Sequence, residues 1–230
     1  HFLEDEGVIR HGGVSVLGQG SVSGVDLARF SPDSVIRAAV RFEIGVFDTT
    51  PVFLFVGRLV RDKGVFDLVE AFIALGARHA NWELWMVGPD EDGLLNILQK
   101  EAAGVGARIR WFGPTLRPEK FFAAADIFVL PSYREGFGSV IIEAAACSIP
   151  SIAYRTNGVI DAIVEGLTGY LVAKGDVAAL TEMMERLGSA PELVIELGLA
   201  ARLRAVKFFA SSIISKAWLD FYCSVLNHRF

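Results

Sequence analysis

From Pro51 onward, short apolar runs of strand length alternate with amphipathic segments of helix length, and this alternation constrains the fold more than any other feature. Six strands are predicted, at residues 52–57, 82–88, 108–113, 126–131, 150–155 and 169–173. Helices are predicted between them, at residues 64–79, 91–103, 117–125, 138–147 and 176–188. The runs VFLFVG and DIFVLP are apolar at nearly every position, which is typical of strands covered on both faces. The sequence therefore predicts an α/β fold with a Rossmann-like, doubly wound, mostly parallel six-stranded sheet and helices on both faces.

The two ends of the chain depart from this pattern. Residues 1–50 contain one predicted strand within 14–32 and then a Gly/Ser-rich turn, and we interpret them as an interdomain connector. Residues 51–207 form the predicted Rossmann-like domain. The chain is predicted to be helical after Pro191, with residues 208–230 as a terminal helix rich in large apolar side chains. Because the sequence begins at His1 without an initiator methionine or a signal peptide, we expect it to be a fragment.

Composition excludes several classes of function. The net charge of −5 argues against a general nucleic-acid binder, which normally carries a basic excess. No apolar run approaches the roughly 18 residues that a membrane span needs. The two cysteines, Cys147 and Cys223, cluster neither with each other nor with the four histidines, so no metal site is predicted. We expect two reduced thiols in a cytoplasmic protein.

The segment FVGRLVRDKG, residues 55–64, places two basic side chains after a buried strand. The strand ends at Gly57, where the missing side chain lets a ligand approach the backbone closely. Arg58 and Lys63 follow, and an arginine fork with a lysine at a strand end can grip a diphosphate. The alternative is a solvated basic loop.

The segment LPSYREGFGSVIIEAAA, residues 130–146, carries a second candidate anion site. Glu135 is predicted to lie in a loop, because a helix that included it would hold Gly136 and Gly138 in its first turn. A helix that starts near Gly138 offers the free N–H groups of Gly138, Ser139 and Val140 to an anion.

Glu143 lies within the apolar part of the same segment, where burying a charge is expensive. It is either a half-exposed glutamate on a buried helix or a carboxylate that accepts hydrogen bonds from a vicinal diol such as a ribose. The loop WFGPTLRPEK, residues 111–120, could offer backbone groups to a base near Thr115. The loop VGPDED, residues 87–92, is interpreted as an ordinary turn. No Ser/His/Asp or Cys/His arrangement is apparent.

Taken in order, these pieces resemble the retaining nucleotide-sugar glycosyltransferases of family 4, also called group 1, which have the GT-B fold. The resemblance rests on GSVSGVDLARF, FVGRLVRDKG, DIFVLPSYREGFGSVIIEAAA, IPSIAYRTNGVIDAIVEGLTGYLV and the terminal W..FY helix, and it covers nearly the whole chain. It implies that residues 51–207 are a nucleotide-sugar-binding domain, the C-terminal half of a GT-B enzyme. It also implies that residues 208–230 cross back to an N-terminal domain that is absent from this sequence.

The resemblance implies a role for each matching residue. Arg58 and Lys63 would hold the donor diphosphate and stabilise charge on the leaving nucleotide. Glu143 would bind the ribose and Glu135 the sugar, so the two glutamates are not an acid/base pair. The remaining donor-binding positions are Gly57, Thr115, Gly136, Phe137, Gly138, Ser139 and Val140, and Glu135, Arg58 and Lys63 are the expected catalytic residues. No cofactor and no metal are expected.

The same resemblance predicts a hexosyl- or N-acetylhexosaminyltransferase that uses a UDP-sugar or a GDP-sugar, with UDP preferred. The acceptor would be a glycan or lipid-linked sugar of bacterial surface polysaccharide synthesis, at the inner membrane face, where the protein could be peripheral. The isolated chain is expected to be inactive without its N-terminal domain. Two alternatives stay open: a non-catalytic nucleotide-sugar-binding module or subunit of a split transferase, and a sugar-nucleotide epimerase of similar fold, for which no acid/base residues are identified.

Overall fold

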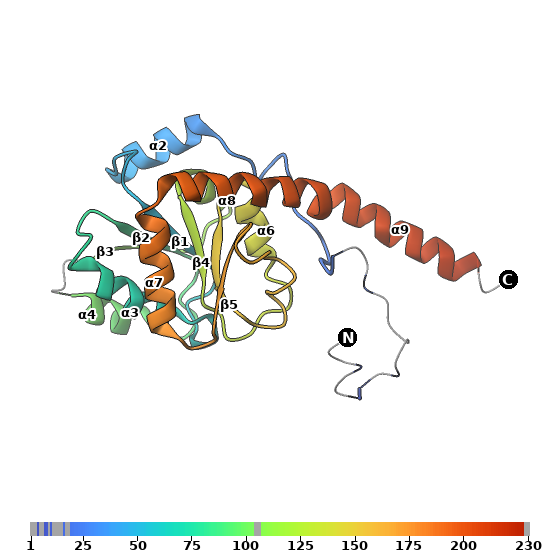
Figure 1. Cartoon of the computed structure of the whole chain (residues 1–230), viewed down its shortest axis with the longest axis horizontal. Helices are drawn as coiled ribbons and strands as arrows, with labels where there is room; N and C mark the ends of the chain where they lie inside the picture. Colours follow the sequence, from blue (N-terminus) through green and yellow to red (C-terminus); the bar gives the residue numbers. More distant parts are fainter. Residues whose placement is uncertain are drawn as a thin grey trace.

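A single parallel sheet forms the centre of the molecule (Figure 1). The computed structural model describes residues 19–103 and 107–227, together with Glu4, Gly7, Val8, Arg10 and Val16. Six strands pair in the order β3-β2-β1-β4-β5-β6, and every pairing is parallel. The strands are β1 (Val52–Val56), β2 (Glu83–Val87), β3 (Arg108–Phe112), β4 (Ile127–Leu130), β5 (Ser151–Tyr154) and β6 (Gly169–Val172). Each lies within its predicted range, so the predicted fold class is confirmed.

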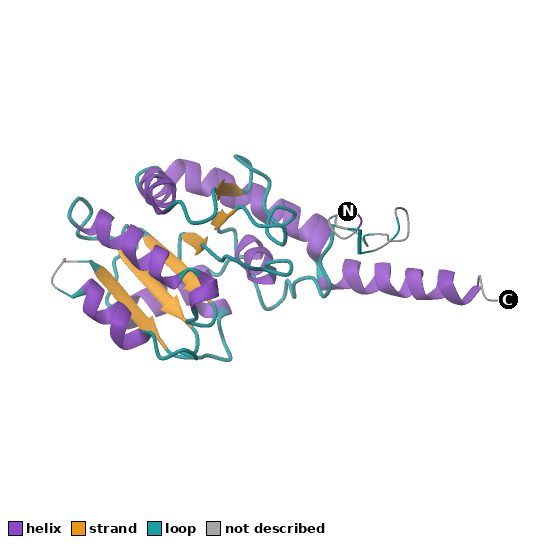
Figure 2. Cartoon of the chain, turned by 90° about the horizontal axis from the view of Figure 1, so that it is seen from below, coloured by secondary structure: helices purple, strands orange, loops and turns teal. Residues whose placement is uncertain are grey.

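Helices cover both faces of the sheet (Figure 2). The helices between strands are α3 (Val65–Gly76), α4 (Leu95–Ala102), α5 (Glu119–Ala124) and α6 (Ser139–Ala146), and α7 (Val177–Gly188) follows β6. α3 packs with α4 and α7, and α5 packs with α6, which also contacts α8 (Pro191–Arg204). A π-helix (Ala205–Phe209) and α9 (Ser211–Asn227) complete the chain.

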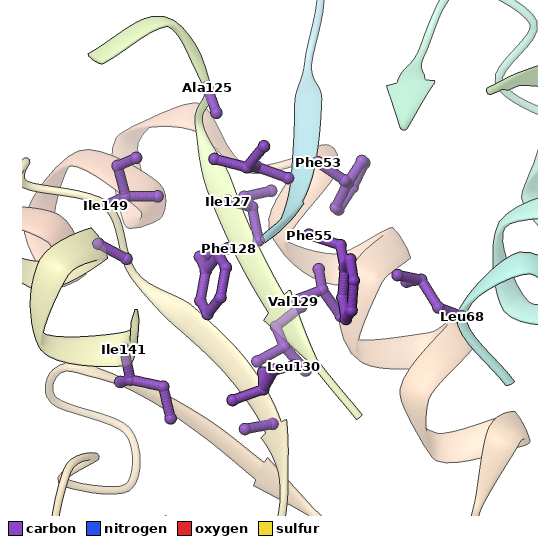
Figure 3. Close-up of a cluster of buried hydrophobic side chains, with 14 of the residues drawn as sticks. Phe53, Phe55, Leu68, Ala125, Ile127, Phe128, Val129, Leu130, Ile141 and Ile149 are labelled. Carbon is purple, nitrogen blue, oxygen red and sulfur yellow. The ribbon is translucent and has the colours of Figure 1, made fainter. Parts of the chain in front are cut away.

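The core lies on both sides of the two central strands (Figure 3). Phe55 of β1 lies toward Leu68 of α3, and Phe128 of β4 lies toward Ile141 of α6 (Figure 3). All four side chains are buried. Burying each one stabilises the fold by roughly 1.5–3 kcal/mol, which explains why these strands are apolar at nearly every position.

The strand order fixes where a ligand can bind. The chain builds outward from β1 to β2 and β3, then returns to place β4 on the other side of β1. This reversal is a topological switch point, and open α/β sheets bind ligands in the crevice at the carboxyl ends of the strands there. The loops that follow β1 and β4 are the two loops that carry the predicted diphosphate and sugar residues.

One helix, α2 (Ser34–Ile44), was not predicted and lies in the segment interpreted as a connector. Its local signals are ordinary: the Asp33 side chain caps its first turn, and Gly45 ends it in the left-handed conformation at φ 76°. Its outer face also carries apolar side chains, since Val35 is 77% exposed and Phe42 is 88% exposed. A periodic contrast between a polar and an apolar face is present, but Arg41 lies on the buried side and the two apolar side chains are exposed.

Arg41 fixes α2 to the sheet. Its guanidinium is 2% exposed and donates to the carbonyls of Ala124 at 2.8 Å, Phe47 at 2.8 Å and Thr50 at 2.9 Å. It also pairs with Asp126 Oδ2 at 2.6 Å, and that oxygen accepts the N–H that opens β1. One buried cation thus joins α2, β1 and the residue before β4.

We predict that Arg41→Met lowers the free energy of unfolding by about 2–4 kcal/mol, because the carbonyls of Ala124, Phe47 and Thr50 lose a buried donor and Asp126 keeps only its ion pair with Arg37 at 2.8 Å. Urea unfolding measures the change. Val35→Ala on the outer face of α2 is the control and should change stability by less than about 0.5 kcal/mol. If Arg41→Met lowered the free energy of unfolding no more than Val35→Ala, Arg41 would not fix α2 to the sheet.

The C-terminal segment leaves the body of the molecule along α9 (Figure 1). Its start is held by a bridge between Val25 and Ala210, and Trp218 Nε1 donates to the carbonyl of Val22 at 2.9 Å. A strand was predicted within residues 14–32, and in the described part of that range the β-pairing is this isolated bridge at Val25. Of residues 14–18, only Val16 is among the described residues. Tyr222 is 58% exposed. No described helix is both long and apolar enough to cross a membrane.

Candidate functional site

Two loops meet at the switch point, one after β1 and one after β4. The β1 loop includes a single 3-10 turn (Arg61–Lys63), and the carbonyl of Asp62 accepts from Tyr133 N at 2.8 Å and Ser132 Oγ at 3.1 Å. Gly64 follows with φ 67°, and a Cβ there would lie 1.9 Å from the carbonyl oxygen of Pro131. Only glycine allows both this conformation and this approach. The two loops are therefore joined through their backbones.

Lys63 and Glu135 form an ion pair across this junction. Nζ of Lys63 lies 2.5 Å from Oε1 of Glu135, and the side chains are 19% and 11% exposed. Glu135 lies in the loop, outside α6, as predicted. Its carbonyl is crowded by Gly158 after β5, where a Cβ would lie 2.1 Å away. The structure therefore brings together the Lys63 ammonium, which has three N–H donors, and the Glu135 carboxylate, whose loop is packed against Gly158.

Arg58 takes a more open position. Its side chain is 57% exposed and pairs with Oε2 of Glu91 at 2.9 Å. Glu91 belongs to the loop after β2, which was interpreted as an ordinary turn, so this partner was missed. The ends of β1 and β2 are close because Gly57 N donates to Val87 O at 2.9 Å and a Cβ on Gly88 would lie 1.9 Å from Gly57 O.

The start of α6 lies beside the ion pair. Gly138 precedes the helix at φ 69°, and no side chain caps the first turn. The N–H groups of Ser139 and Val140 are therefore available to an anion, as the helix start predicted. Gly136 is exposed, and Phe137 packs against Phe209 with ring centroids 5.5 Å apart, which anchors the loop to the π-helix that precedes α9.

Glu143 occupies the second turn of α6. Burial raises the pKa of its carboxyl to about 7, partly opposed by the charge of Arg29. In the part of the chain that the structure describes, its carboxylate makes no hydrogen bond and no ion pair. The side chain is half-buried, so its carboxylate is partly desolvated and the position is open to a ligand that donates hydrogen bonds.

Arg29 also fixes the loop that carries Thr115. Its guanidinium donates to the carbonyl of Leu116 at 2.6 Å and pairs with Glu119 at 3.0 Å. Thr115 is exposed, and its hydroxyl accepts from Arg117 N at 3.0 Å. The connector was assigned no role at the site, yet Arg29 from that segment holds this loop and acts on Glu143.

A cavity of about 450 Å³ lies at the opposite edge of the sheet and contains none of the candidate residues. Pro51, Ile127 and Ile149 line it where strands begin, together with residues of α2 and α8. The candidate residues lie at the carboxyl edge of the sheet, so this cavity is separate from the candidate site. Among the described residues, no group of three or more His, Cys, Asp or Glu side chains is placed to hold a metal ion.

A family model, "Glycosyl transferases group 1", matches residues 36–204, which include every candidate residue. The chain belongs to the group 1 glycosyltransferases. The predicted family is thereby confirmed, and the sheet with its switch-point crevice is one half of a GT-B fold.

One curated relative is a glycosyltransferase, and two solved structures share the fold. The chain is 30% identical over 234 residues to the capsular polysaccharide biosynthesis glycosyltransferase CapM of Staphylococcus aureus, covering 99% of this chain and 60% of that protein. A glycosyltransferase structure from Rickettsia africae superposes with a TM-score of 0.87 at 24% identity, over 97% of this chain and 60% of that one. HepE of Anabaena in complex with UDP-glucose gives 0.80 at 22% identity, over 87% and 56%. The chain thus spans little more than half of these relatives.

The state of Glu143 makes a prediction about stability and pH. A carboxyl with a folded-state pKa of about 7, above its usual value, stays protonated in the fold after it has ionised in the unfolded chain. Its contribution to stability is therefore lost as pH rises from about 4.5 to 7. Glu143→Gln should flatten the fall in melting temperature over that window.

Melting curves at pH 5 and pH 7.5 measure this effect. Glu43→Gln, on the exposed side of α2, is the matched control and should leave the pH dependence of the parent unchanged. Equal pH dependence in Glu143→Gln and the parent would show that the carboxylate is not destabilised in the fold.

Proposed function

We propose that the chain is the donor-binding domain of a retaining glycosyltransferase that moves a sugar from a nucleoside diphosphate sugar, with UDP as the preferred nucleotide. One arrangement carries the proposal: the Lys63–Glu135 pair precedes the uncapped start of α6, and one turn further on Glu143 has no hydrogen bond or ion pair among the described residues. A diphosphate, a sugar and a ribose need these three kinds of contact.

Each residue then has a physical task. The Lys63 ammonium and the Arg58 guanidinium would balance the charge that grows on the diphosphate as the sugar departs. N–H groups at the start of α6 add the positive end of the helix dipole. The Glu143 carboxylate would accept hydrogen bonds from the ribose hydroxyls, which would offset the cost of its burial.

Glu135 would contact the transferred sugar while Lys63 keeps the carboxylate charged. In retaining members of this family the acceptor attacks from the face that the nucleotide leaves, so the departing diphosphate can take the acceptor's proton. We propose that the reaction follows this front-face course, with Arg58 and Lys63 in place of a metal ion. Thr115 would meet the base through its backbone.

The descriptions of two relatives support the proposed classes of donor and acceptor. HepE is described in complex with UDP-glucose, which supports a UDP-sugar donor. CapM is described as a capsular polysaccharide enzyme, which supports a surface glycan or lipid-linked acceptor for a hexosyl- or N-acetylhexosaminyltransferase. The acceptor site would lie on a facing N-terminal domain, against which the exposed apolar side chains of α9, such as Leu219 and Tyr222, would pack.

Calorimetric titration with UDP and GDP tests the donor site. Arg58→Ala, Lys63→Ala and Glu143→Ala should each weaken UDP binding about 10–100-fold, since a hydrogen bond to a charged group contributes roughly 1.5–3 kcal/mol. Arg61→Ala is the control, because Arg61 lies in the same loop but stacks over Phe66 at 4.8 Å.

Failure to bind either nucleotide, or equal affinities in the variants and the parent, would contradict the proposal. A non-catalytic module or the subunit of a split transferase would need the same donor contacts. Sugar transfer to an acceptor, not binding, separates those alternatives from an enzyme.

A further inference from the structure

Tyr133 contacts the chain on both flanks of Lys63. Its N–H donates to the carbonyl of Asp62 at 2.8 Å, one residue before the lysine. Its hydroxyl donates to Oδ2 of Asp67 at 2.7 Å, one helical turn after the lysine. Tyr133 is also two residues before Glu135 in the β4 loop. A single residue therefore spans the segment that carries Lys63 while it leads directly into the segment that carries Glu135.

The acceptor of this hydroxyl is itself held in place. Oδ2 of Asp67 accepts a second hydrogen bond from the hydroxyl of Tyr154 at 2.6 Å, and Tyr154 is fully buried at the end of β5. The two tyrosine rings meet edge to face with centroids 5.6 Å apart. The hydrogen bond to Asp67 raises the pKa of Tyr133, so the hydroxyl remains a donor at neutral pH. Asp67 is thus a fixed point on α3.

Neither tyrosine hydroxyl contacts Lys63 or Glu135, so the network acts through the backbone. Tyr154 lies on β5 and reaches Asp67 from the sheet, whereas Tyr133 reaches it from the loop after β4, which also carries Glu135. Loss of the Tyr133 hydroxyl would free the loop that holds Glu135. Loss of the Tyr154 hydroxyl would remove a bond to the same oxygen without touching that loop.

We propose that Tyr133 is a positioning residue of the donor site, which holds Glu135 at the distance from Lys63 that the diphosphate and sugar require, with Asp67 as its anchor. This inference rests on the proposed function for its effect on the donor. The positioning itself is a property of the fold that can be measured without any ligand.

Amide hydrogen exchange tests the positioning directly. Tyr133→Phe keeps the ring and removes only the hydroxyl, and Tyr154→Phe is the matched control that removes the other bond to Asp67. Exchange across residues 132–138 should be at least about threefold faster in Tyr133→Phe than in Tyr154→Phe when both melt at similar temperatures. Equal exchange in the two variants would overturn the proposal.

Titration with UDP-glucose tests the consequence by a double-mutant cycle. Tyr133→Phe should raise Kd about 3–10-fold in the parent and less than about twofold when Lys63 is already alanine, because the two changes act on one contact. The same fold-change in both backgrounds would mean a general structural loss and would overturn the proposal. If the parent binds no UDP-glucose, the proposed function fails, and the exchange comparison alone decides the positioning.

Discussion

The approach of Gly64 to the carbonyl of Pro131 is the contact on which the rest of the site depends. A Cβ at residue 64 would lie 1.9 Å from that oxygen, so the loops after β1 and β4 can meet only because the residue is glycine. Their meeting allows Asp62 to accept from Tyr133 and Ser132. Those bonds in turn place Lys63 and Glu135 2.5 Å apart. The Lys63–Glu135 ion pair thus depends on the close backbone approach that Gly64 allows.

The candidate residues at this edge of the sheet comprise two ion-paired basic side chains and one separate carboxyl group, that of Glu143. Lys63 pairs with Glu135, and Arg58 pairs with Glu91, so each basic side chain has an acidic neighbour in the free protein. A diphosphate that bound to Lys63 and Arg58 would share these cations with the carboxylates or displace the carboxylates. A ligand that also carries hydroxyl groups could donate hydrogen bonds to the carboxylates. Glu143 stands apart because burial raises its pKa to about 7. Its ionised form is therefore less favourable in the folded protein than in the unfolded chain.

Much of the fold could be predicted because its signal is local. The runs VFLFVG and DIFVLP are apolar throughout since β1 and β4 are covered on both faces, and Gly136 and Gly138 exclude Glu135 from α6. The helical signals of α2, an amphipathic pattern between Asp33 and Gly45, were present in the sequence but were overlooked in a segment interpreted as a connector. At the site, residue types gave the candidate positions, but the pairings depend on contacts far apart in sequence. Glu91 with Arg58, Arg29 with the Thr115 loop, and Tyr133 with Asp67 have no sequence signature.

The central claim is that a nucleotide binds at the carboxyl edge of the sheet, between the β1 loop and the start of α6. Amide chemical-shift mapping during a UDP titration tests it most directly. The largest shifts are expected at residues 57–64 and 135–143, with little change around the cavity between α2 and α8. Shifts concentrated around that cavity, at the opposite edge of the sheet, would contradict it.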